Sequence, residues 1–316
     1  MSTPFSRFLL GRPVRLALTS VAIGALLFAS WRYRVSIADI LAKANLWLLG
    51  LSTMLALLAN YLTGLPFNNF LKQFGINVPN WKTCYLQLVV QVTKYVPGNV
   101  WGAILQAQLL DSSRIGAIFL AGIDTSVFYM MTLSTTGLAL LVYSHHPLAA
   151  GLIAVTGWLI SARVASSAWL ARSVGWIARL LGRTLHIVLS KPTTGEIGRL
   201  FTWAMLHAIA QAGSVIILLI AVTHYTAGDI LIGTASICLA WVVGTMAIII
   251  PSGLGVREFA FVALATMFHV SADTQSLAAI AIVARVAQTL PDIFAAVIVA
   301  GTEIIRPTQA SSIDIR

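Results

Sequence analysis

Charged side chains are scarce in this chain. Only 9% of its 316 residues are charged, 58% are hydrophobic, and the mean hydropathy is +0.88. Soluble domains carry about 25% charged residues, so the composition excludes an ordinary soluble globular protein and predicts a polytopic membrane protein. Apolar runs recur from end to end, which predicts a single membrane domain over residues 1–306 and a disordered tail at 307–316.

Acidic residues are the scarcest charged type, with 10 Asp and Glu against 20 Lys and Arg. The net charge of +10 therefore comes partly from the missing acids. The basic residues flank the apolar runs, as they do in cytoplasmic loops of membrane proteins. This placement predicts a partner with an anionic lipid headgroup and excludes nucleic acid as the preferred one.

Cysteine is nearly absent, and no motif unites His, Cys and carboxylate residues. Cys84 and Cys238 stand alone in apolar runs, as small packing residues do. His145 and His146 are adjacent and would point apart on a helix, which favours a solvated turn, and His207 is interpreted as a hydrogen-bonded packing residue. We therefore expect no metal, no cofactor and no enzymatic centre.

Six apolar runs are long enough to cross a bilayer. They cover residues 14–31, 46–67, 115–143, 148–160 with its continuation, 200–222 and 277–300. The first run follows a basic N-terminus, as in a signal peptide, but it is long for one and two arginines follow it directly. We interpret it as an uncleaved first span that leaves the N-terminus in the cytoplasm.

A basic segment at 163–199 separates the two halves of the chain. Its six cations face a single acid, Glu196, which is the strongest positive-inside signal present. Tryptophan and leucine alternate with the arginines at helical spacing, so we predict an amphipathic helix on the inner leaflet. With these spans both termini are cytoplasmic and the protein lies in the inner membrane. The cations are Arg163, Arg172, Arg179, Arg183, Lys191 and Arg199.

Two breaks interrupt the apolar pattern. Near 84–110, two short runs flank Lys94-Tyr-Val-Pro97-Gly98, which predicts a re-entrant hairpin or, alternatively, one kinked helix. Near 230–268, the motif Pro251-Ser-Gly253-Leu-Gly255-Val-Arg257-Glu258 interrupts a second pair of runs. Irregular backbone at membrane depth is tolerated where it is buried or lines a wet cavity.

The predicted fold is therefore all-α, with about six spans and two hairpins that enter from opposite faces. Such opposed breaks in two halves are typical of a transporter site built on an inverted repeat. The alternative for the second break is a surface loop that carries an interfacial ion pair.

These two motifs resemble the flippase-like transmembrane domain of the lysylphosphatidylglycerol synthases. The Pro-x-Gly-x-Gly-x-Arg-Glu run is matched by residues 251–258, and an arginine of the last span is matched by Arg285. The resemblance covers nearly the whole chain and implies movement of a lipid or a lipid-linked headgroup between leaflets.

Two departures from the family pattern limit what the resemblance implies. Asn99, Trp101 and Gln106 stand where many relatives carry an acid and an arginine. The chain ends at Arg316, before any match to the soluble aminoacyl-transferase domain of the bifunctional synthases. We therefore do not expect synthase activity.

The candidate site combines cations with freed backbone donors. Arg257 and Arg285 are candidate phosphate ligands, and Lys94 could assist at the inner mouth. Glu258 and Asp124 would offset these cations in the empty state. The alternative is that Arg257–Glu258 and Arg285–Asp124 are ion pairs that only hold helices together.

Three functions compete at this point. The leading hypothesis is a translocase for an anionic phospholipid or a polyprenyl-phosphate-linked glycan precursor. A second is a scaffold that docks a glycosyltransferase or another cell-envelope enzyme through the basic segment. An integral-membrane transferase ranks last, because no nucleophile or metal constellation is found. Assembly as a homo-oligomer is compatible with all three.

Overall fold

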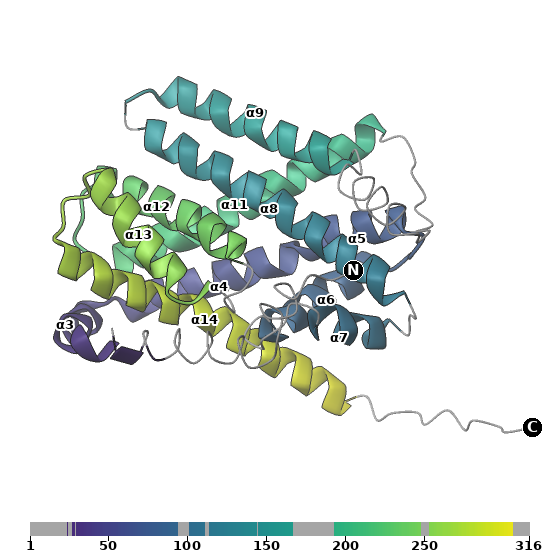
Figure 1. Cartoon of the computed structure of the whole chain (residues 1–316), viewed down its shortest axis with the longest axis horizontal. Helices are drawn as coiled ribbons and strands as arrows, with labels where there is room; N and C mark the ends of the chain where they lie inside the picture. Colours follow the sequence, from purple (N-terminus) through teal and green to yellow (C-terminus); the bar gives the residue numbers. More distant parts are fainter. Residues whose placement is uncertain are drawn as a thin grey trace, which may run out of the picture.

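The computed structural model describes residues 24, 27–28, 30–93, 101–110, 114–143, 145–166, 193–247 and 253–305. Throughout these residues the regular structure is helical, without a strand, which confirms the all-α prediction (Figure 1). The helices are α3 (Arg34–Lys43), α4 (Leu46–Leu62), α5 (Gly64–Gln73), α6 (Asn80–Thr93), α7 (Trp101–Leu109), α8 (Ile115–Tyr143), α9 (Pro147–Ser166), α11 (Thr194–Val222), α12 (Ala227–Met246), α13 (Val256–Met267) and α14 (Thr274–Ile305).

Six stretches of the described chain are long and apolar enough to cross a membrane, and this is a multi-pass membrane protein. Five of them coincide with predicted spans, whereas the predicted span 14–31 lies largely outside the described residues. The sixth is α12, which we had expected to be half of a hairpin. Its 20 residues extend about 30 Å, which is the thickness of the hydrocarbon core. The six are Leu46–Gln73, Ile115–Tyr143, Pro147–Ser166, Thr194–Val222, Ala227–Met246 and Thr274–Ala295.

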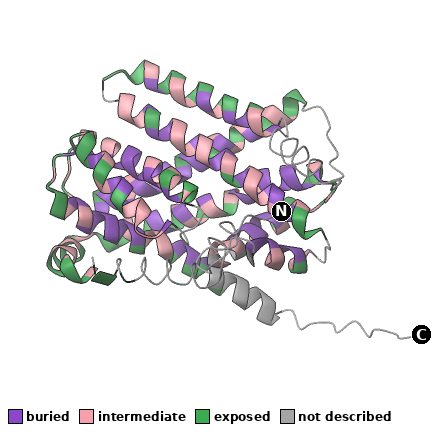
Figure 2. Ribbon diagram, viewed as in Figure 1, coloured by how far each residue is buried: buried purple, intermediate pink, exposed green. Residues whose placement is uncertain are grey.

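The outermost helix shows how the molecule meets lipid. In Figure 1, α9 lies along one edge and packs against α8. Its other side carries large exposed apolar residues at helical spacing, including Leu148, Leu152 and Leu159, and Figure 2 shows this helix as mainly exposed or partly buried. An apolar stripe that faces away from the protein is suited to acyl chains.

Small residues allow the helices to approach closely. Ser52 of α4 and Ser214 of α11 each donate a hydroxyl hydrogen bond to the other's backbone carbonyl, both at 2.8 Å. Gly64 lies so close to the backbone of Cys84 that a Cβ there would overlap it. Such contacts are typical of helix association in membranes. The two cysteines are buried, as predicted for packing residues.

Two apolar clusters form the core. One gathers around Phe67, Phe70 and Phe128, at α5, α7, α8 and the start of α11. The other contains Leu218 and Phe261 and joins the end of α11 to α12, α13 and α14. The cavity described below is lined by residues of both clusters.

In the regions of the two predicted hairpins, α6 packs against α7 and α12 packs against α13, and re-entry of either pair into the membrane stays a prediction. In the first pair, Gly102 faces Val90 and Thr93. Helices α6, α7 and α13 have 14, 9 and 12 residues, fewer than a span requires. That the pairs enter the membrane from opposite faces, and that they form an inverted repeat, stay predictions.

The basic segment 163–199 is described only at its ends. Arg163 is exposed near the end of α9, and residues 167–192 lie outside the described residues. Helix α11 begins earlier than predicted, at Thr194, because Thr193 and Glu196 form a capping box. The Thr193 amide donates to Glu196 Oε2 at 3.0 Å, and the Glu196 amide donates to Thr193 Oγ1 at 3.2 Å.

Candidate functional site

The glycines of the second motif are needed for the turn that joins α12 to α13. Gly253 and Gly255 have φ of +61° and +79°, where an L side chain is strained. A Cβ on Gly253 would also lie 2.6 Å from the carbonyl oxygen of Gly244 in α12. The turn therefore favours glycine at position 255 because of its positive φ, and at position 253 because of both its positive φ and the close contact with Gly244.

Arg257 also packs against Gly244 of α12. Its aliphatic stem lies on Gly244, where any Cβ would overlap the Arg257 Cγ. The guanidinium donates to Thr245 Oγ1 at 3.5 Å. Because α13 begins at Val256, Arg257 and Glu258 belong to its first turn and point in different directions.

Glu258 faces the last long helix. Its Oε1 lies 3.6 Å from Arg285 Nε of α14, and both side chains are largely buried, at 13% and 9% exposed. Among the described residues, neither carboxylate oxygen has a hydrogen-bond partner. The two charges are thus close enough to attract each other but too far apart for a hydrogen bond.

These three charged residues line one large cavity of about 890 Å³, which we call the polar cavity. Residues of α4, α6, α7, α8, α11, α12, α13 and α14 surround it. Gly102, just after the first break, and Gly253, within the second, both line it. The structure therefore brings the described edges of both predicted breaks to a single site.

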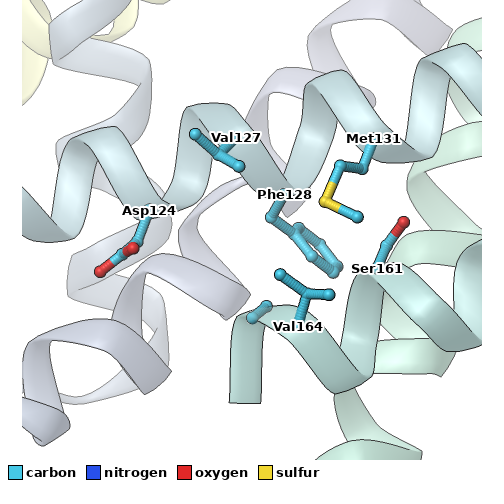
Figure 3. Close-up of a pocket in the computed structure, with 7 residues that line it drawn as sticks. Asp124, Val127, Phe128, Met131, Ser161 and Val164 are labelled. Atoms are coloured by element: carbon cyan, nitrogen blue, oxygen red, sulfur yellow. The ribbon is translucent and has the colours of Figure 1, made fainter. Parts of the chain in front are cut away.

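Asp124 does not join this group. Its side chain lines a separate small cavity between α8 and α9, with Phe128, Met131 and Ser161, as Figure 3 shows. Its Oδ2 is buried without a hydrogen-bond partner among the described residues. The alternative in which Asp124 pairs with Arg285 is not the observed arrangement, since Arg285 lies beside Glu258.

Four predicted positions cannot be placed. Lys94, Pro97, Gly98 and Pro251 lie outside the described residues. Of the predicted site, Gly253, Arg257, Glu258 and Arg285 therefore meet at the polar cavity. Gly255 acts through the backbone, as the residue that precedes α13.

The uncharged polar lining of the cavity was not predicted from the sequence. Six amide side chains line it, from five helices besides α13. His207, which we had interpreted as a hydrogen-bonded packing residue, lies against Tyr129 with ring centroids 4.0 Å apart. Its Nδ1 has no hydrogen-bond partner among the described residues. Polar residues inside apolar spans are visible in the sequence and could have indicated such a site. The amides are Asn60, Gln87, Gln91, Gln106, Gln211 and Gln288.

Comparison with known proteins identifies the family. No curated protein matches the chain. A family model for the lysylphosphatidylglycerol synthase TM region matches residues 14–296, which include every described residue that lines the polar cavity. The chain belongs to the lysylphosphatidylglycerol synthase transmembrane-region family.

Proposed function

We propose that this protein is a lipid translocase of the inner membrane. It moves an anionic phospholipid or a polyprenyl-phosphate-linked glycan precursor between leaflets, without changing the lipid chemically. The observation that carries the proposal is the polar cavity, because it places Arg257 and Arg285 together inside a membrane domain. Cytoplasmic termini and a homo-oligomeric state are compatible with it.

The size of the cavity supports a small polar guest. Ligand sites in proteins commonly enclose about 300–1,000 Å³, and this cavity measures about 890 Å³. A lipid headgroup that enters it would leave water and lose hydration around its phosphate. Arginine offsets that loss because its planar fork of N–H donors matches phosphate oxygens and keeps its charge in a dry site.

The arrangement of charges supports the same role. Glu258 lies 3.6 Å from Arg285 and accepts no hydrogen bond from the described residues. It reduces the cost of a buried guanidinium in the empty state. A phosphate that reaches Arg285 therefore does not have to break a hydrogen bond to Glu258.

The test is leaflet exchange by the purified protein in liposomes that contain a fluorescent anionic lipid. A charge-assisted hydrogen bond contributes about 1.5–3 kcal/mol, so Arg257→Ala and Arg285→Ala should each slow exchange by about ten- to a hundredfold. Arg163→Ala is the matched control, because Arg163 is exposed at the end of α9 and does not line the cavity.

Each result has a distinct meaning. Exchange that requires both cavity arginines but not Arg163 supports the proposal. Equal exchange in all variants retains the translocase and removes the phosphate site. No exchange of any anionic or polyprenyl lipid refutes the translocase and favours the scaffold, which neutralisation of Arg172, Arg179 and Arg183 would test through loss of a bound envelope enzyme.

A further inference from the structure

The uncharged side chains of the polar cavity carry information about the headgroup. Six amides line it, and each amide both donates and accepts hydrogen bonds. Sugar and glycerol hydroxyls have the same dual character. An ammonium group, in contrast, only donates, and burial of its charge is costly unless a negative charge lies nearby.

The cavity hydroxyls are already used by their own helices. Thr125 donates to the Ala121 carbonyl at 2.7 Å, Thr245 to that of Trp241 at 2.7 Å, and Thr289 to that of Val286 at 2.7 Å. These groups need no ligand. Selection of a headgroup is therefore better examined at the amides, of which Asn60 already donates to Asp292 at 3.4 Å.

Gln106 is the clearest of them. Its side chain is 3% exposed, it lines the cavity, and its Nε2 has no hydrogen-bond partner among the described residues. His207 also lines the cavity and is 4% exposed, and its Nδ1 likewise has no hydrogen-bond partner among the described residues. A buried polar atom without a partner is costly, and a guest with hydroxyl groups would remove the cost.

The charges of the described lining fit a single anion. Two arginines and one glutamate leave one net positive charge, 2 − 1 = 1, which matches one phosphodiester. Glu258 is the sole carboxylate among the described lining residues and already lies beside Arg285. Asp292 accepts from Asn60 at 3.4 Å and is not part of the lining. A cationic headgroup would therefore find no carboxylate of its own.

We infer that the cavity selects a lipid with one phosphodiester and an uncharged, hydroxyl-rich headgroup, and disfavours an aminoacylated, cationic one. This inference rests on the proposed translocase function and names its substrate class. Phosphatidylglycerol and a glycosyl-phosphoryl-polyprenol share this chemistry on different lipid tails.

The experiment compares three acyl- or prenyl-labelled lipids in liposomes with the full-length protein: phosphatidylglycerol, a glycosyl-phosphoryl-polyprenol and lysyl-phosphatidylglycerol. We expect faster exchange of one or both hydroxyl-bearing lipids than of the lysyl lipid. Exchange of both supports recognition by headgroup alone, and exchange of one supports recognition of headgroup and tail together. Equal or faster exchange of the lysyl lipid overturns the inference but leaves the translocase intact. No exchange of any lipid refutes the translocase itself.

Two substitutions on α7 sharpen the test. Gln106→Leu should slow exchange of the hydroxyl-bearing lipid about fivefold, the effect of one lost hydrogen bond. Gln108→Leu is the matched control, since Gln108 is exposed on the same helix and does not line the cavity. Gln106→Glu adds an anion and should shift the ratio of rates toward lysyl-phosphatidylglycerol. An unchanged ratio in a Gln106→Glu protein that elutes and melts like the wild type contradicts the inference.

Discussion

The contact between Gly244 and Arg257 gives the sharpest test of the site geometry. A Cβ on Gly244 would overlap Arg257 Cγ and lie 2.7 Å from its Nε. Gly244→Ala should therefore displace the arginine stem while the backbone of α12 stays helical. The expected result is a folded protein whose lipid exchange falls toward that of Arg257→Ala.

A double-mutant cycle can separate the two effects of Gly244→Ala on the free energy of unfolding, which are the gain in helix propensity and the cost of overlap with Arg257. Alanine in a helix interior gains about 1 kcal/mol over glycine, whereas overpacking costs about 1–3 kcal/mol. Gly244→Ala alone should thus lower the free energy of unfolding by about 0–2 kcal/mol. In an Arg257→Ala background the overlap is gone, and the same substitution should stabilise by about 1 kcal/mol.

The measurement is reversible unfolding in detergent micelles, with a coupling of about 1–3 kcal/mol expected between the two sites. Gly50→Ala in α4 is the control, because no heavy atom lies within 4 Å of its added Cβ. Gly253→Ala should not be rescued by Arg257→Ala, since its overlap is with the Gly244 backbone. Additive effects of Gly244→Ala and Arg257→Ala would refute the described packing.

Three further predictions concern stability. Glu258→Ala should cost about 3–5 kcal/mol because it removes the carboxylate that lies beside the buried Arg285, whereas the double change Glu258→Leu with Arg285→Met should unfold closer to wild type; a larger loss in the double variant would contradict this. Gly64→Ala should cost about 1–3 kcal/mol through overlap with the Cys84 backbone, while Gly151→Ala, which meets nothing within 4 Å, should not destabilise; equal melting temperatures would show that α5 and α6 can separate. Asp273 accepts from the Ser276 amide at 2.8 Å, and hydrogen bonds from the Ser276 side chain and backbone lower its pKa. Its stabilisation is therefore present above the unfolded value of about 3.9 and lost as the pH falls through the lower folded value. The melting temperature of Asp273→Asn should lie below wild type at pH 7 and converge with it in acid; a constant gap would exclude the charge as its cause.

Five of the spans could be predicted because each is a long apolar run between charged or turn-forming residues. The span formed by helix α12 was harder to predict. The apolar run 230–250 continues to Pro251, so length alone did not distinguish a span followed by a short helix from two halves of a hairpin. The structure ends α12 at Met246 and begins α13 at Val256.

Within the site, the charged residues could be predicted but their neighbours could not. Arg257, Glu258 and Arg285 are conspicuous because charges inside apolar runs are costly. Which acid approaches Arg285 depends on how α13, α14 and α8 pack, and the sequence alone left Asp124 as a candidate. The amides escaped notice for a similar reason, since Gln87, Gln106 and Gln211 come from separate helices and converge only in the folded chain.

The geometry of Glu258 and Arg285 bears on whether the pair is structural or functional. A carboxylate that locks two helices would form charge-assisted hydrogen bonds of about 2.7–2.9 Å. Here the closest described approach is 3.6 Å, and both carboxylate oxygens are buried without hydrogen bonds from the described residues. A pair retained only for stability would gain from closer contact, because desolvation of two charges is offset only by good geometry and further hydrogen bonds. The described pair lacks that geometry and lines the polar cavity together with Arg257, which is why our proposal gives it a role in binding an anion.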